Sequence, residues 1–145
     1  DIFSYFGLGC RNVSKIFVPE KYSIPMLFDH WKKFEPVICH HKYANNYDYQ
    51  KAIMMVNKTP FYDSGFVLIT ESKNLVSPIS VVYYETYHSI SDLTEKLIQA
   101  QNKIQCIVRS IDPASIPFGQ AQFPGPGDYA DKVDTMKFLI GLSKA

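Results

Sequence analysis

The sequence of 145 residues lacks the features that mark several large classes of protein. Its 15 basic residues are balanced by 14 acidic ones, so it has no strongly charged surface for nucleic acid. No apolar run approaches the ~20 residues that cross a bilayer, and no segment has the order of a secretory signal peptide. We therefore expect a cytoplasmic chain that neither binds nucleic acid nor spans a membrane.

Motifs for metal and phosphate are also missing. Structural zinc sites use ligands at characteristic spacings, and the sequence has neither a Cys-x-x-Cys nor a His-x-x-x-His pair. The segment "SIPFGQAQFPGPG", residues 115–127, is rich in glycine and proline but lacks the lysine–hydroxyl pair of a P-loop. We expect no metal site, and we expect this segment to be an apolar loop that lines a pocket through Phe118.

Cysteine is scarce, and its three copies, Cys10, Cys39 and Cys106, lie far apart. An odd number without a secretory signal indicates reduced thiols rather than a disulfide framework. Cys39 and Cys106 lie in apolar, strand-like runs, and we expect both to pack in the core. Cys10 differs from them because it lies in "YFGLGCRNVSK", among glycines, aromatic residues and basic residues.

The sequence does have a clear alternation of strand-like and helix-like segments. Short apolar runs predict five strands, at residues 14–19, 36–41, 66–72, 76–87 and 104–111. Helical spacing predicts three helices, with faces formed by Leu27, Phe28, Trp31 and Phe34, by Tyr49, Ala52, Ile53 and Val56, and by Leu93, Leu97, Ala100 and Ile104. This alternation predicts one α/β domain over residues 1–145, with a mainly parallel sheet flanked by helices.

Capping residues suggest where the helices begin. Ser23 followed by Pro25 predicts the start of the first helix, Asn46 the start of the second and Ser91 the start of the third. The Pro/Gly-rich segment 112–134 is longer than a connection needs. We expect it to be functional or to pack against a partner, which makes a homo-oligomer one possibility.

Cys10 is the first candidate for chemistry. A cysteine becomes a nucleophile when nearby cations or backbone N–H groups stabilise its thiolate. Gly7 and Gly9 permit backbone conformations that let a substrate approach closely, and Arg11 and Lys15 add positive charge. The alternative is a small apolar residue in the core, because free cysteines are often buried. The pattern alone leaves both interpretations open.

The pair His40–His41 is the second candidate. Adjacent residues of a strand point to opposite faces, so these histidines and Cys39 cannot form one compact metal site without a turn. One histidine can act as a base toward Cys10. The alternative is a strand end at which one histidine is hydrogen bonded and the other is solvated.

Three motifs in order resemble the aldehyde dehydrogenase superfamily. "GLGCRNVSKIFVP" resembles its nucleophile signature, "NLVSPISVVYYETY" its Glu-x-Phe-Gly-Pro segment with the following strand, and "IPFGQAQ" its Pro-Phe-Gly-Gly segment. Three segments are similar in sequence to the LuxC-type acyl-CoA reductases within that superfamily: "DIFSYFGLGCRNVSK", "HHKYANNYDYQKA" and "IQCIV". The resemblance implies an aldehyde-dehydrogenase-like catalytic domain.

This resemblance implies a reductase that converts a fatty acyl-CoA to an aldehyde. Cys10 would attack the thioester, expel CoA and carry the acyl group until a nicotinamide cofactor, NADPH by analogy, delivers hydride. The backbone N–H of Cys10 would stabilise the oxyanion. The cofactor-contacting Glu and Phe of the family correspond to Asn74 and Val76 here, and Phe118 with Gly119 would contact the substrate.

The family places its dinucleotide-binding domain mostly before the nucleophile, whereas this sequence begins at Asp1. We therefore expect these residues to be the catalytic part of a longer reductase. Two other functions remain open. One is a Cys–His acyl transferase or thioester hydrolase with His40 or His41 as base. The other is a non-catalytic interaction domain, in which Cys10 would show no preference for acyl thioesters over generic alkylating reagents.

Overall fold

A four-stranded sheet forms the centre of the protein. The computed structural model describes residues 1–109, 115–130 and 133–142. The strands are β1 (Lys15–Pro19), β2 (Tyr62–Asp63), β3 (Leu68–Glu71) and β4 (Val81–Tyr87), in the order β1-β4-β3-β2. β4 is parallel to both β1 and β3, and only β2 is antiparallel to its neighbour. The predicted α/β class with a mainly parallel sheet is confirmed.

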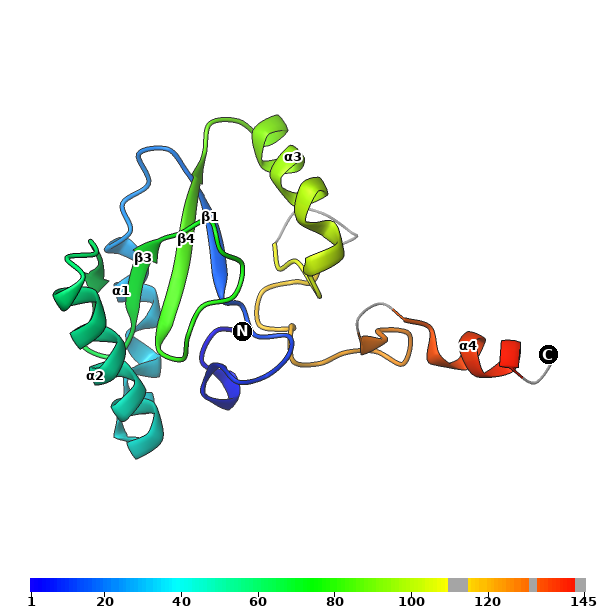
Figure 1. The fold of residues 1–145 in the computed structure, drawn as a ribbon, viewed down its shortest axis with the longest axis horizontal. Coiled ribbons are helices and arrows are strands. Elements are labelled where there is room, and N and C mark those ends of the chain that lie inside the picture. Colours follow the sequence, from blue (N-terminus) through cyan, green and yellow to red (C-terminus); the bar gives the residue numbers. More distant parts are fainter. Residues whose placement is uncertain (110–114, 131–132, 143–145) are drawn as a thin grey trace.

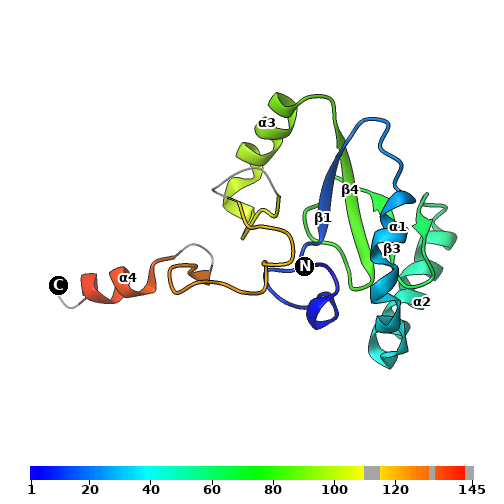
Figure 2. The same ribbon diagram turned by 180° about the vertical axis from the view of Figure 1, so that it is seen from behind.

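Within the described ranges, the elements beside the sheet include four α-helices and three 3₁₀-helices. They are η1 (Ser4–Gly7), α1 (Met26–Trp31), η2 (Lys32–Cys39), α2 (His41–Val56), α3 (Ile90–Ala100), η3 (Gln101–Lys103) and α4 (Thr135–Leu142). In Figures 1 and 2, α1 and α2 lie beside β3, α3 lies beside β4, and α4 extends away from the rest. No helix of the described ranges is long and apolar enough to cross a membrane.

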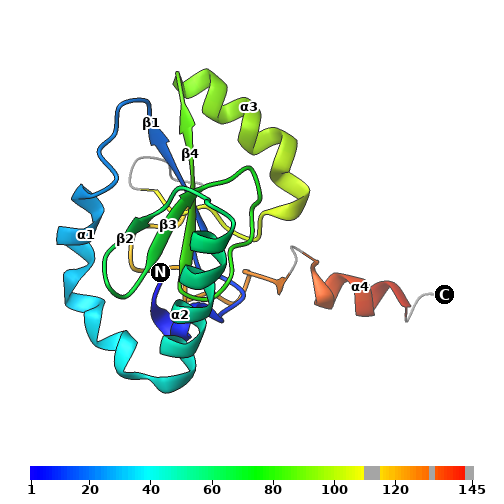
Figure 3. The same cartoon turned by 60° about the vertical axis from the view of Figure 1, so that its left-hand side comes forward.

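The core forms on both faces of β3. Leu68 and Ile69 are fully buried, and successive residues of a strand point to opposite faces. Leu68 belongs to a cluster with Tyr47 and Met54 of α2. Ile69 belongs to a second cluster, against which Trp31 of α1 packs. α1 and α2 therefore cover different faces of the strand, an arrangement that Figure 3 shows with α2 in front of the sheet.

The predicted strand at 36–41 is wrong. Residues 32–39 form the 3₁₀-helix η2, with Pro36 inside it, and His40 caps α2 in an extended conformation. A run of four apolar or small residues carries no reliable period, so it fits a strand and a helical turn equally well. Cys39, expected in the core, lies at the end of η2 and is exposed.

The second helix was predicted with the wrong start and the wrong face. α2 begins at His41 rather than after Asn46, and its buried side chains are those of Tyr43, Tyr47 and Met54. Of the expected face, Tyr49 is 62% and Val56 is 80% exposed. The spacing rule failed because α2 carries apolar residues on several faces, and two buried tyrosines take the core positions.

The last predicted strand, 104–111, is also wrong in the part that the structure describes. Only Val108 pairs there, in an isolated bridge to Ile116. α3 begins one residue before the predicted Ser91, and its N-cap is Ser89, whose hydroxyl accepts a hydrogen bond from the amide of Asp92. The remainder of 104–111, like parts of the 112–134 segment, lies outside the described residues.

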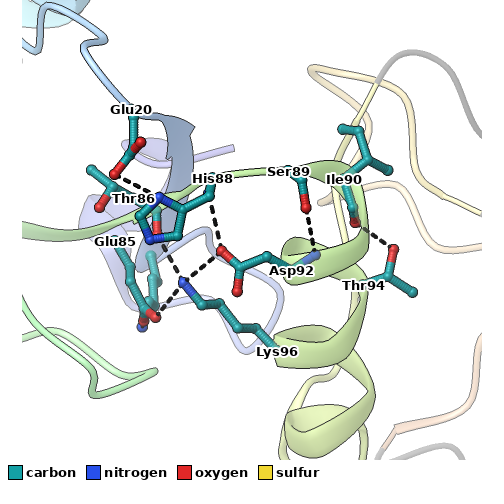
Figure 4. A network of polar contacts seen from close by, with 10 residues as sticks. Glu20, Glu85, Thr86, His88, Ser89, Ile90, Asp92, Thr94 and Lys96 are labelled. Atoms are coloured by element: carbon teal, nitrogen blue, oxygen red, sulfur yellow. Dashed lines mark hydrogen bonds and ion pairs between the residues drawn. The ribbon is translucent and has the colours of Figure 1, made fainter.

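A charged network joins α3 to the sheet, as Figure 4 shows. The ammonium of Lys96 lies 3.3 Å from carboxylate oxygens of both Glu85 and Asp92 and donates to the carbonyl of Thr86 at 2.8 Å. Glu85 also pairs with Lys15, whose side chain is only 5% exposed. Since Glu85 lies on β4 and Lys15 on β1, the network connects both strands to α3.

A second polar cluster joins α2 to β2. The carboxylate of Asp63 accepts hydrogen bonds from the hydroxyl of Tyr47 and from the amide of Gly65, and it lies 2.7 Å from the ammonium of Lys51. Burial alone raises the pKa of Asp63, but these donors outweigh it and hold the pKa below its ordinary value. A lowered pKa in the folded state means that the ionised carboxylate stabilises the fold.

We predict that Asp63→Asn lowers the free energy of unfolding at pH 7 by about 1–3 kcal/mol, the usual worth of hydrogen bonds to a charged group. The stabilisation is complete above the unfolded pKa of about 4 and is lost as pH falls through the folded pKa. Urea denaturation at several pH values measures the difference, which should shrink in acid. Asp29→Asn, at an exposed position of α1, is the control. A difference that stays constant down to pH 3 would contradict the assignment.

Candidate active site around Cys10

The chain reverses direction just before Cys10. Tyr5, Phe6 and Gly7 have φ values of 50°, 59° and 78°, so three successive residues are left-handed. This conformation costs roughly 1–2 kcal/mol for each residue other than glycine. Asn12 offsets the cost, because its side-chain amide lies 2.9 Å from the carbonyl of Ile2 and 2.8 Å from that of Ser4. The segment before Cys10 is therefore a compact turn.

Cys10 is exposed on this turn, and the alternative of a buried, packing cysteine is wrong. Its neighbour Arg11 is the buried residue, with 8% of its surface exposed. The Arg11 Nε donates to the carbonyl of Ala121 at 2.7 Å, and an Nη lies 3.9 Å from the carboxylate of Asp128. Arg11 thus fixes the backbone beside Cys10 while the thiol remains accessible.

The turn meets the "PFGQAQ" segment, which lies more than a hundred residues later. The side-chain amide of Gln122 donates to Asn12 at 3.0 Å, and the carboxylate of Asp1 accepts from the amides of Gly119 and Ala121. Gly119 has a φ of 83°, a conformation that favours glycine, and the space where a Cβ would lie is open. Two of the three motifs that resemble the dehydrogenase family are therefore in contact.

The third motif approaches from the loop before β4. The Ser14 hydroxyl donates to the carbonyl of Leu75 at 2.8 Å, and the Lys15 ammonium donates to the carbonyl of Lys73 at 3.1 Å. The loop that carries Asn74 and Val76 is thereby attached to the residues that follow the cysteine turn. Both of these side chains are exposed, Val76 to 78%.

Two hollows lie near the turn, and the thiol of Cys10 lines neither of them. A cavity of about 30 Å³ lies between the turn and residues 77–82, and it has room for one or two water molecules. A shallower hollow of about 300 Å³ is lined by Phe3, Phe34 and neighbouring residues. Neither Cys10 nor Phe118 lines either one, and Phe118 is 70% exposed. The pocket that we expected Phe118 to line is not among them.

His40 lies near the turn, although not on the predicted strand end. Its ring stacks on the ring of Phe6 with centroids 4.0 Å apart, and His40 caps α2. His41 is the first residue of α2 and is exposed. Among the described residues, no group of three or more His, Cys, Asp or Glu side chains could hold a metal ion.

The sequence did not reveal the residues that organise the site, which are Asp1, Asn12 and Gln122. Asparagine is a common turn residue, so Asn12 does not stand out in the sequence. No local pattern predicts that its side chain contacts several carbonyls. The hydrogen bond between the side chains of Asn12 and Gln122 joins residues 110 positions apart, so only the folded chain shows it.

Comparisons with known proteins add no identification: no protein family, no curated protein and no solved structure matches this chain.

The close packing of Gly9 leads to a testable prediction. A Cβ at Gly9 would lie 2.3 Å from the Asn12 side-chain oxygen and 3.0 Å from that of Gln122, whereas a Cβ at Gly127 would meet open space. Gly9→Ala should therefore lower the free energy of unfolding by about 1–3 kcal/mol, as overpacking does. Gly127→Ala should leave it within about 0.5 kcal/mol. Guanidinium denaturation measures both, and equal values for the two variants would show that the turn is not packed as described.

Proposed function

We propose that this chain is the catalytic domain of an NAD(P)H-dependent fatty acyl-CoA reductase of the LuxC type, within the aldehyde dehydrogenase superfamily and acting in the cytoplasm. The observation that carries the proposal is the exposed thiol of Cys10 on a turn that Arg11 and Asn12 hold against residues 117–122. A nucleophile needs an accessible sulfur on a rigid support, and the turn meets both conditions.

Cys10 performs covalent catalysis in this scheme. Its thiolate attacks the carbonyl carbon of the acyl thioester, a new C–S bond forms, and the carbonyl oxygen becomes an oxyanion. The backbone N–H of Cys10 is the local donor to that oxyanion. The intermediate collapses, the bond to the CoA sulfur breaks, and the acyl group remains on Cys10. Because Arg11 is anchored to Ala121, the backbone beside Cys10 keeps its position through these steps.

The second half of the reaction needs a hydride donor. Bound NADPH would supply a hydride to the acyl carbon, after which Cys10 would depart as a thiolate and an aldehyde would be released. The side-chain amide of Asn74 can bond a ribose hydroxyl, and Val76 offers an apolar surface, since both side chains are exposed. These are contacts for the edge of a dinucleotide, so we propose that most of its binding surface belongs to an upstream domain of a longer protein.

Phe118 and Gly119 would contact the acyl group. Their segment is joined to the cysteine turn through Ala121, and Phe118 is largely exposed. An exposed phenylalanine offers apolar surface to a hydrocarbon chain. The open space at Gly119 leaves room for the chain to pass the backbone.

A Cys–His acyl transferase or thioester hydrolase is the second candidate. The stack of His40 on Phe6 supports it, because Phe6 belongs to the turn that leads to Cys10. In that case the imidazole would activate water or an acceptor to remove the acyl group, and no nicotinamide would be required.

We predict that intact-protein mass spectrometry after brief incubation with a long-chain acyl-CoA shows a mass gain of one acyl group. Cys10→Ser should abolish the adduct, whereas Cys39→Ser should retain it, since Cys39 is also an exposed free thiol. Acylation lost equally in both variants would point to non-specific thiol modification. No adduct in the wild-type chain or in the longer protein would refute the reductase proposal.

A second prediction separates the two candidates. If the reductase proposal is right, His40→Gln leaves the rate at which acylated protein loses its acyl group in buffer within about twofold of wild type. General-base catalysis contributes 10²–10⁴-fold, so a hydrolase would slow by roughly that factor. His41→Gln is the matched control, because His41 is adjacent and exposed. Time-resolved mass spectrometry of the acyl adduct measures all three proteins.

A further inference from the structure

Cys106 lies beside the cysteine turn although it is far away in sequence. Its half-buried Sγ donates a long hydrogen bond, 3.8 Å, to the carbonyl of Arg11, across 95 residues of chain. Arg11 directly follows Cys10, so this hydrogen bond places the thiol of Cys106 beside the backbone one residue after Cys10. The expectation that Cys106 is a core residue is only partly met, because its side chain retains access to solvent.

Groups of the cysteine turn also act on the thiol of Cys106. Burial raises the pKa of Cys106, the guanidinium of Arg11 acts in the opposite direction, and the thiol of Cys10 raises it further. Cys39 lies at the end of η2, and Cys106 is the cysteine that hydrogen bonds the backbone beside Cys10.

Neither Cys10 nor Cys106 lies in a helix or a strand. A disulfide needs Cα atoms about 4.4–6.8 Å apart and a suitable torsion, so small adjustments are usually required. Cys10 lies on a turn and Cys106 in a segment without helix or strand, so neither is held by a ladder of backbone hydrogen bonds. Arg11 remains bonded to Ala121, so the turn keeps its place while the cysteine side chains rotate.

We propose that Cys10 and Cys106 form a reversible intramolecular disulfide when the protein meets hydrogen peroxide. The thiolate of Cys10, the more exposed sulfur, attacks one peroxide oxygen, and the O–O bond breaks to give a sulfenic acid and hydroxide, which takes the proton that the thiol released and becomes water. The thiolate of Cys106 then attacks that sulfur, forms the S–S bond and expels hydroxide, which takes a proton to become water. The net change oxidises two thiols and reduces one peroxide to two waters.

The disulfide gives Cys106 a role as a resolving cysteine. Without a neighbouring thiol, a sulfenic acid on Cys10 can proceed to sulfinic and sulfonic acids, which thiols do not reduce. The bond would protect Cys10 and block its chemistry until a dithiol restores it. This block on acyl transfer rests on the proposed function, whereas formation of the disulfide does not.

The test uses the full chain treated with equimolar hydrogen peroxide, blocked with iodoacetamide and digested with trypsin without reduction. Trypsin places Cys10 in peptide 1–11, Cys106 in peptide 104–109 and Cys39 in peptide 34–42. The expected product is a 1–11/104–109 cross-link, two hydrogens lighter than the separate peptides and lost after dithiothreitol. Cross-links to 34–42, or peptides 1–11 and 104–109 recovered uncrosslinked, overturn the proposal.

Two variants sharpen the test. Cys106→Ser should remove the cross-link and increase the fraction of Cys10 converted to sulfinic or sulfonic acid by at least severalfold, whereas Cys39→Ser should leave both unchanged. The wild-type peptide map decides the proposal even if Cys106→Ser does not fold. Acyl-CoA added to the reduced protein separates the two ideas. A cross-link without acyl transfer would contradict only the proposal of a reductase. Acyl transfer without a cross-link would contradict only the proposal of a disulfide.

Discussion

The hydrogen bond from the buried guanidinium of Arg11 to the carbonyl of Ala121 is the contact on which the candidate site depends. It joins segments 110 residues apart at 2.7 Å. Removing the partner of a buried charge costs several kcal/mol, so the two segments are held together strongly. The position of Cys10 follows from this bond, because a residue adjacent to an anchored side chain cannot move independently. A separate contact, from the Cys106 thiol to the carbonyl of Arg11, brings Cys106 close to the turn.

The candidate site lies at an unusual place relative to the strands of the sheet. Ligands of open α/β sheets generally bind outside the carboxyl ends of the strands. The turn that carries Cys10 instead precedes the amino end of β1 and is not part of a strand. The Asn12 amide, the Asp1 carboxylate and the Gln122 amide support this turn with hydrogen bonds to backbone and side chain. An exposed thiol on a hydrogen-bonded turn suits acyl transfer and reversible oxidation alike.

Predictions from sequence succeeded where one physical requirement dominated. β3 and β4 are rich in Val, Ile and Leu and buried at Leu68 and Val82, so their apolar runs indicated strands correctly. They failed where a pattern fits several structures. The apolar run before His40 forms a 3₁₀-helix rather than a strand. α2 buries tyrosines rather than Ile53, because the hydroxyl of Tyr47 also donates a hydrogen bond to Asp63.

The sequence by itself determined the α/β class, the central strands and Cys10 as the residue worth examining, because periodicity and glycine content are local properties. Only the tertiary structure decided that Cys10 is exposed, that Arg11 is buried beside it and that Cys106 is its neighbour. These relations join residues roughly a hundred positions apart. They arise when the chain satisfies buried donors and acceptors, a requirement that no short stretch of sequence displays.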